Sequence, residues 1–174
     1  MDFCSKFSVS NMSVGAQHPT RCVTCSAPTL TYINLTYGDG CAIAWLIVHL
    51  TYFQEQINVP NKMTNVQLET CAQCIFDGYH HLKTTEIMLF LARLCGGMYP
   101  VDWHGYVTPT KIVSALREHF MPWRNNLLYK IDKQREEQER ESQLRDKDLM
   151  TREEYEEIKM LTRMYEMEIN QTSV

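Results

Sequence analysis

The sequence has few glycines and prolines, no long apolar run and no excess of positive charge. Seven glycines and six prolines among 174 residues argue against a turn-rich β-sandwich and against a collagen-like chain. The longest apolar run, from Cys41 to Val48, has eight residues, whereas a membrane-spanning helix needs about 20. The net charge of −4 argues against a general nucleic-acid-coating protein, which would neutralise phosphates with an excess of Lys and Arg.

Common catalytic signatures are missing as well. The chain contains neither a G-x-x-x-x-G-K-[ST] phosphate loop nor a G-x-G-x-x-G fingerprint. It also lacks a G-x-S-x-G elbow and an H-E-x-x-H helix. The glutamates of residues 153–157 are interpreted as a solvated helix face rather than as a catalytic pair. We therefore expect a protein without enzymatic activity.

The N-terminus has no basic segment followed by an apolar one, the pattern that marks an export signal. The cysteine count is seven, an odd number. These two features together predict a reducing compartment, the cytoplasm, in which the thiols are reduced or bound to a metal rather than paired in disulfides.

What is present indicates a globular front followed by a charged tail. Hydrophobic residues make up 44% and charged residues 22% of the chain, which is a globular composition. Residues 123–174 hold 10 of the 17 Lys and Arg and 13 of the 21 Asp and Glu. The pattern predicts a loosely structured, cysteine-containing arm (1–27), a helical bundle (28–122) and a charged helical extension (123–174).

Four segments of the bundle carry apolar residues at helical spacing, near 40–56, 64–78, 84–95 and 108–122. Thr64 and Gln67 have the spacing of a capping box, and Thr108 followed by Pro109 is a typical helix start. Asp39 is the candidate cap of the first helix. The predicted fold class is therefore all-α, with a compact bundle of about four helices. Pro122 should kink or restart the last of them.

The extension is predicted to contain a long charged helix and a terminal amphipathic helix. Residues 133–145 are almost wholly polar, so this segment should be exposed to solvent. Thr151 and Glu154 form a second capping-box pattern. The apolar stripe that follows is the candidate partner-binding surface: Tyr155, Ile158, Leu161, Tyr165 and Ile169. It could fold back on the chain, join a second copy in a homo-oligomer, or bind another protein.

Two C-x-x-C pairs are candidate metal ligands. Cys22, Cys25, Cys71 and Cys74 could together hold one Zn²⁺. However, the pairs are 45 residues apart, which is long for a zinc ribbon. Cys71 and Cys74 also lie in the middle of a predicted helix, where cysteine often serves as a small core residue. Core packing is therefore the competing interpretation, and the expected cofactor is none or a single zinc ion.

The aromatic loop of residues 98–107 is the candidate nucleic-acid surface. Its Trp103 could stack on an unpaired base, with Arg93, Lys111 and Arg117 as the nearest basic side chains. The alternative is that Trp103 and Tyr106 fill the helix bundle. With so few basic residues, any DNA binding should be weak and lost at modest salt.

A succession of short motifs from Pro28 to Asn125 resembles a family of small helical proteins carried by phages and mobile elements of gut bacteria. The matching residues are Pro28-Thr29-Leu30, Tyr37-Gly38, Ala44-Trp45-Leu46, Lys62-Met63-Thr64 with Gln67, Tyr79 with Leu82, Thr85-Glu86-Ile87, the aromatic loop between Gly97 and Gly105, Thr108-Pro109 with Ile112, and Leu116 with Arg124. This chain departs from the family in two places. It has Tyr99-Pro100 where related members tend to have Tyr-Gly, and its cysteine-bearing N-terminal segment is peculiar to this chain.

Members of that family are similar in turn to phage helicase loaders, also called replisome organisers. The resemblance implies a DNA-replication accessory protein that binds a replicative helicase in the host cytoplasm and has no catalytic activity. A different class remains open: a phage interaction protein that is a virion component or an inhibitor of a host defence system. The same bundle could serve either role, because a fold does not fix a function.

Overall fold

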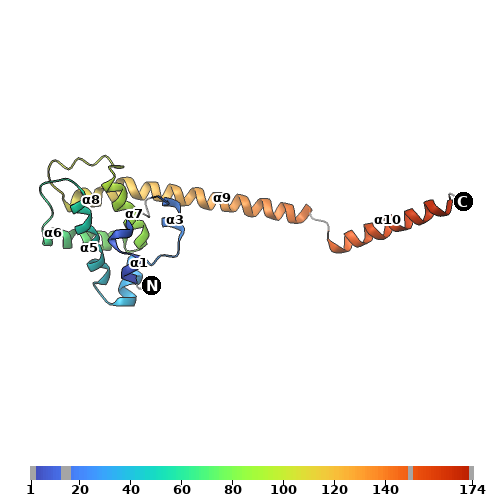
Figure 1. Ribbon diagram of the computed structural model, residues 1–174, viewed down its shortest axis with the longest axis horizontal. Helices are drawn as coiled ribbons and strands as arrows, with labels where there is room; N and C mark the ends of the chain where they lie inside the picture. The colour runs from blue at the N-terminus through green and yellow to red at the C-terminus, as the bar shows by residue number, and fades with distance from the viewer. Residues whose placement is uncertain (1–2, 13–16, 149–150, 173–174) are drawn as a thin grey trace. The chain divides into compact units, whose positions relative to one another are not determined.

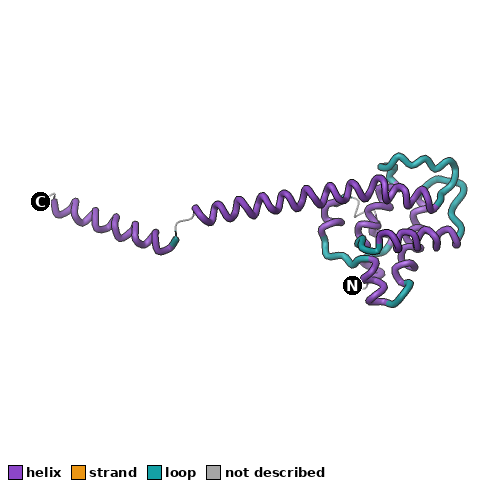
Figure 2. The backbone as a smooth tube through the Cα atoms, turned by 180° about the vertical axis from the view of Figure 1, so that it is seen from behind, coloured by secondary structure: helices purple, strands orange, loops and turns teal. Residues whose placement is uncertain are grey.

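The computed structural model describes residues 3–12, 17–148 and 151–172, except for the side chains of 146–148 and 165–172. Within these residues the fold is all-α, as predicted: helices joined by loops, no strand, and two isolated bridges that pair Thr29 with Lys83 and Asn61 with Tyr106 (Figures 1 and 2). The chain divides into two units, here called the head (Met1–Leu128) and the extension (Tyr129–Val174).

The helices are joined by loops. Their bounds are α1 (Phe3–Lys6), η1 (Val9–Asn11), α3 (Pro19–Thr24), α4 (Leu30–Tyr37), α5 (Cys41–Gln56), α6 (Asn65–Tyr79), α7 (Thr84–Cys95), α8 (Pro109–Ala115), the π-helical turn η2 (Leu116–Phe120), α9 (Met121–Asp148) and α10 (Arg152–Thr172). Among the loops, the segment 96–108 between α7 and α8 is a long one.

The predicted helix starts of the head are confirmed with one exception. Thr64 Oγ1 accepts the Gln67 N–H at 3.3 Å, and Gln67 Oε1 accepts the Thr64 N–H at 2.9 Å. Thr108 accepts the Lys111 N–H and precedes a proline at the first helical turn. The prediction for Asp39 was wrong, because Gly40 is the N-cap of α5 at φ +83°. Glycine adopts that left-handed conformation without the steric cost that a side chain brings.

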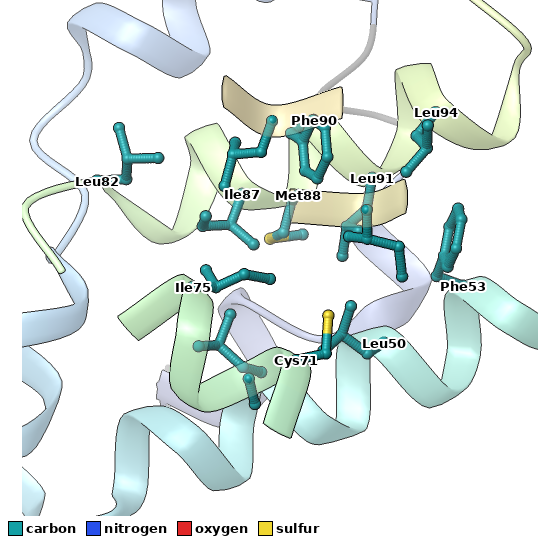
Figure 3. Packing of buried hydrophobic residues seen from close by; sticks show 14 of the residues in the cluster. Leu50, Phe53, Cys71, Ile75, Leu82, Ile87, Met88, Phe90, Leu91 and Leu94 are labelled. Atoms are coloured by element: carbon teal, nitrogen blue, oxygen red, sulfur yellow. The ribbon is translucent and has the colours of Figure 1, made fainter. Parts of the chain in front are cut away.

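The core of the head is built from α5, α6 and α7. Leu50 and Phe53 of α5, Ile75 of α6 and Leu91 of α7 lie in one interior (Figure 3). Helix α7 contributes most, since eight of its 12 residues are buried. A helix that is buried over so much of its surface must be packed on more than one side. Its main neighbours are α3 and α5.

The N-terminal segment is part of this core, so the expectation of a loose arm was wrong for its described residues. Phe7 and Met12 are 6% and 4% exposed. The Trp45 indole N–H donates to the Phe7 carbonyl at 3.0 Å, and the Thr85 hydroxyl donates to the Cys22 carbonyl at 2.7 Å. The contacts join residues far apart in sequence, which is why local composition did not reveal them.

The chain stays helical through Pro122, but the helix changes geometry just before the proline, where α9 begins at Met121. The turn before it is π-helical, and the Met121 N–H donates to the Leu116 carbonyl. A proline lacks an N–H and crowds the carbonyl four residues earlier, and the wider π turn accommodates both effects. The head consequently extends into α9: the Trp123 ring lies 5.6 Å from that of Phe120, and the boundary between units falls after Leu128 rather than at 122.

The extension contains the rest of α9 and α10. The side chains of residues 132–145 are exposed, as the polar sequence predicted. None of the described helices is both long enough and apolar enough to cross a membrane.

Candidate functional site

Helix α10 begins where the capping-box pattern predicted. Thr151 Oγ1 accepts the Glu154 N–H at 3.2 Å, and Glu154 Oε2 accepts the Thr151 N–H at 2.8 Å. These two bonds satisfy donors that the first turn of a helix would otherwise leave to water. They fix the start of the helix, and with it the rotational position of every later side chain.

The apolar stripe of α10 is exposed in its described part. Tyr155, Ile158 and Leu161 are 56%, 49% and 60% exposed, and residues three apart share one face of a helix. Met160 is 65% exposed and faces the opposite side, two residues from Ile158. Tyr165 and Ile169 belong to α10, but their side chains lie outside the described residues. Clustered exposed apolar side chains are typical of an interaction surface, and we call this stripe the α10 face.

The predicted nucleic-acid residues are engaged within the head. The Lys111 ammonium donates to the Trp103 carbonyl at 2.7 Å and lies 4.8 Å from the centre of the Tyr106 ring. The Trp103 ring is half-buried and lies 5.9 Å from the Phe53 ring of the core. These contacts bring together two of the four residues predicted to bind nucleic acid, Trp103 and Lys111. Trp103 thus packs against the core of the bundle, in line with the alternative interpretation of this residue. Tyr106, by contrast, remains 49% exposed.

The other two basic residues also have partners. The Arg93 guanidinium stacks on Trp123 at 3.6 Å from the ring centre, where a cation is attracted by the π-electron face. Arg117 pairs with the adjacent Glu118 at 2.7 Å on the surface. A phosphate that approached these three residues would have to compete with these contacts.

The four candidate zinc ligands do not form one site. Cys71 is fully buried in α6, where burial raises the pKa of its thiol to about 12, while Cys74 is exposed. Cys22 and Cys25 lie at the end of α3, against Thr85 of α7. Among the described residues no three His, Cys, Asp or Glu side chains converge in a way that could hold a metal ion. Cys71 is therefore a core residue, in agreement with the interpretation that competed with zinc binding.

An ion pair that the sequence did not reveal joins α7 to α9. Arg124 donates to Glu86 Oε1 at 2.6 Å, and the Glu86 side chain is fully buried. Glu86 Oε2 accepts the Lys83 N–H at 2.8 Å. The partners are 38 residues apart, so no helical spacing indicates the pair. The one available signal was the position of Glu86 in the first turn of its helix, which favours an acidic residue.

The surface of the head includes a groove and a pocket. An open groove of about 600 Å³ runs between α5 and α6, with Ile43, Ile47, Glu69 and Cys74 in its lining. A pocket of about 560 Å³, here called the N-terminal pocket, is lined by residues of the N-terminal segment and of α7. The lining includes Lys6, His18, Arg21, Cys22, Cys25 and Thr85.

Comparison with protein families, with curated proteins and with solved structures finds no match for this chain.

Proposed function

We propose that this protein is a non-catalytic adaptor of the helicase-loader type, which binds a replicative helicase through the α10 face in the cytoplasm of its host cell. The observation that carries the proposal is the exposure of Tyr155, Ile158 and Leu161 on one side of a capped helix. The choice of a helicase as partner follows from the sequence resemblance described above.

The energetics of the α10 face favour a protein partner. Burying one large apolar side chain contributes roughly 1.5–3 kcal/mol, so the three described members of the face can offset part of the cost of association. The flanking side chains, among them Glu157 and Lys159, are charged and exposed. An apolar strip with a polar rim is the usual anatomy of a helix that docks in a groove.

The head supports the same proposal through its charges. Arg93, Lys111 and Arg117 each contact a neighbouring side chain or carbonyl, so they are poorly placed to grip a phosphate backbone. An adaptor that reaches DNA through its protein partner does not need them for that purpose.

The test is a direct binding measurement between the full chain and a purified bacterial replicative helicase, with the chain labelled for fluorescence anisotropy. Ile158→Glu should weaken binding at least tenfold, because it places a charge in the apolar contact. Met160→Glu is the matched control: it makes the same kind of change on the opposite side of α10 and should stay within threefold of the wild type. Circular dichroism of both variants checks that α10 remains helical.

Two outcomes would contradict the proposal. Equal binding by the wild type and Ile158→Glu would remove the α10 face from the interaction. No binding of the wild type to the helicase would remove the replication role and favour the alternative, a virion component or an inhibitor of a host defence system.

A further inference from the structure

The two C-x-x-C pairs lie in opposite electrostatic surroundings. Cys22 and Cys25 line the N-terminal pocket together with the basic residues Lys6, His18 and Arg21. Among the described residues that line this pocket, none is acidic. Cys74 lines the groove between α5 and α6, where Glu69 is the charged residue in the described lining. On a chain of net charge −4, the N-terminal pocket is thus a local site that attracts anions.

The thiols of this pocket differ in access. Cys25 is half-buried, and its Sγ lies 3.5 Å from Thr85 Oγ1 and 3.7 Å from the Cys22 carbonyl oxygen. Cys22 is 6% exposed, and burial raises the pKa of its thiol. A thiolate is the form that attacks a disulfide. Cys25, the more exposed of the two lining cysteines, is therefore placed to react first with a molecule in the pocket.

We propose that Cys22 and Cys25 form a thiol–disulfide exchange site whose co-substrate is a small anionic disulfide, the chemical class to which oxidised glutathione belongs. The basic side chains of Lys6, His18 and Arg21 hold the carboxylates of the incoming molecule, and the pocket has room for its body. The site is independent of the α10 face and goes beyond the adaptor role.

The reaction has two steps. The Cys25 thiol gives its proton to solvent, and its sulfur attacks one sulfur of the small disulfide, so that a mixed disulfide forms and one small thiolate leaves. The Cys22 thiol then loses its proton and attacks the Cys25 sulfur, which releases the second small thiolate. Both leaving thiolates take up protons from solvent. In balance, two protein thiols are oxidised to one disulfide, and one small disulfide is reduced to two thiols.

Closure of the Cys22–Cys25 bond requires a small movement at a helix end. The Cys25 N–H donates to the Arg21 carbonyl at 2.9 Å, so the last helical turn of α3 includes both cysteines. Cβ atoms three residues apart on such a turn are about 5–6 Å apart, whereas a disulfide needs about 3.5–4.5 Å. Cys25 is the C-cap, and its ψ of 159° has already left the helix. The backbone movement that brings the two Cβ atoms together can therefore occur at Cys25, after which α3 does not continue.

The test treats the full chain with oxidised glutathione, which is anionic, and in parallel with cystamine, which is a cationic disulfide. Mass spectrometry of peptides follows each cysteine with time. With oxidised glutathione, Cys25 should react at least fivefold faster than Cys74, although Cys74 is more exposed. With cystamine the order should reverse. Both preferences should shrink at 1 M salt, where the screening length is only about 3 Å.

Variants test the roles of the two thiols and of the basic side chains one at a time. In the wild type the mixed disulfide should give way to a chain that has lost two hydrogens, while in Cys22→Ser the adduct on Cys25 should persist. The double charge reversal Lys6→Glu with Arg21→Glu leaves both thiols in place. It should slow the reaction of Cys25 with oxidised glutathione at least fivefold and accelerate its reaction with cystamine.

The proposal would be overturned by equal rates at Cys25 and Cys74 with oxidised glutathione, or by an unchanged rate in the charge-reversed variant. It would also be overturned if the adduct on Cys25 persisted equally in the wild type and in Cys22→Ser, because Cys22 would then not resolve it. The charge-reversed variant keeps the test decisive even if Cys22→Ser fails to fold.

Discussion

The head and the extension are both helical, but different interactions stabilise their helices. In the head, α7 has eight buried residues out of 12, so its stability comes from tertiary packing. In the extension, residues 132–145 are exposed, and the ion pairs present are surface pairs such as Arg135–Glu139 at 3.8 Å. Helices of the second kind depend on caps, helix length and neighbouring side chains along the sequence. Equivalent substitutions should therefore have unequal effects in the two units.

The largest contrast is expected between two glutamates that both pair with an arginine. Glu86→Ala leaves Arg124 without its buried partner and removes the acceptor of the Lys83 N–H, and it should lower the free energy of unfolding by about 4 kcal/mol. Glu139→Ala removes a partner of Arg135 where both side chains are more than 60% exposed, and it should change stability by less than about 0.5 kcal/mol. Urea unfolding followed by tryptophan fluorescence measures Glu86→Ala, because all three tryptophans precede Tyr129 and report on the head. Circular dichroism in the same titration measures Glu139→Ala in the extension.

A smaller contrast is expected between two leucines. Leu91 is fully buried in the core of the head, and Leu91→Ala should cost about 3 kcal/mol through lost burial and the cavity left behind. Leu144 is 57% exposed on α9, and Leu144→Ala should stay within about 0.5 kcal/mol. The same urea titration, followed by circular dichroism, measures both. A cost for Leu144→Ala near that of Leu91→Ala would mean that the extension is packed in solution.

The same contrast explains what the sequence could predict. Thr64 with Gln67, Thr108 with Pro109 and Thr151 with Glu154 lie three residues apart or less, and all three helix starts were predicted correctly. The all-α class followed from helical periodicity. Local sequence rules succeeded wherever the stabilising contact is itself local.

Contacts between distant parts of the chain were missed. The Phe7 carbonyl accepts a hydrogen bond from the Trp45 indole, 38 residues away, and the Glu86–Arg124 pair has the same separation. Neither follows from a periodic pattern. The candidate zinc site failed for a related reason: the spacing within each C-x-x-C pair is informative, but only the packing of α3 and α6 determines whether two pairs meet. The basic lining of the N-terminal pocket also arises from tertiary packing.

Removal of a helix cap should have a smaller effect, and one that differs between the head and the extension. Thr64→Ala and Thr151→Ala each remove one capping hydroxyl, which typically costs about 1 kcal/mol. The first should lower the stability of the whole head, because α6 packs into its core. The second should reduce helicity in the extension and leave the midpoint of the fluorescence transition unchanged. Circular dichroism at 222 nm and tryptophan fluorescence, recorded on the same samples, distinguish the two results. A shifted fluorescence midpoint in Thr151→Ala would show that the units are coupled.

The smallest expected effect concerns pH. All six histidines precede Tyr129, so a response between pH 7.5 and 5.5 belongs to the head. Burial holds the pKa of His49 below its usual range. Its Nδ1 lies 2.9 Å from the Trp45 carbonyl oxygen, so Nδ1 carries the proton and Nε2 must take up a second one. Nε2 is buried, and burial outweighs the backbone carbonyls of Trp45 and Phe7, which favour the charged ring, so the charged form is disfavoured in the native state.

The sign of this effect follows from proton linkage. Between the native pKa of His49 and its unfolded value of about 6.5, the unfolded chain binds more protons than the native one, so stability falls as the pH drops through that window. The melting temperature from fluorescence should therefore decrease from pH 7.5 to pH 5.5. The decrease should be smaller in His49→Gln, which cannot bind the proton, while His18→Gln, at an exposed histidine, serves as the control. An equal decrease in His49→Gln and in the wild type would assign the acid sensitivity of the head to another group.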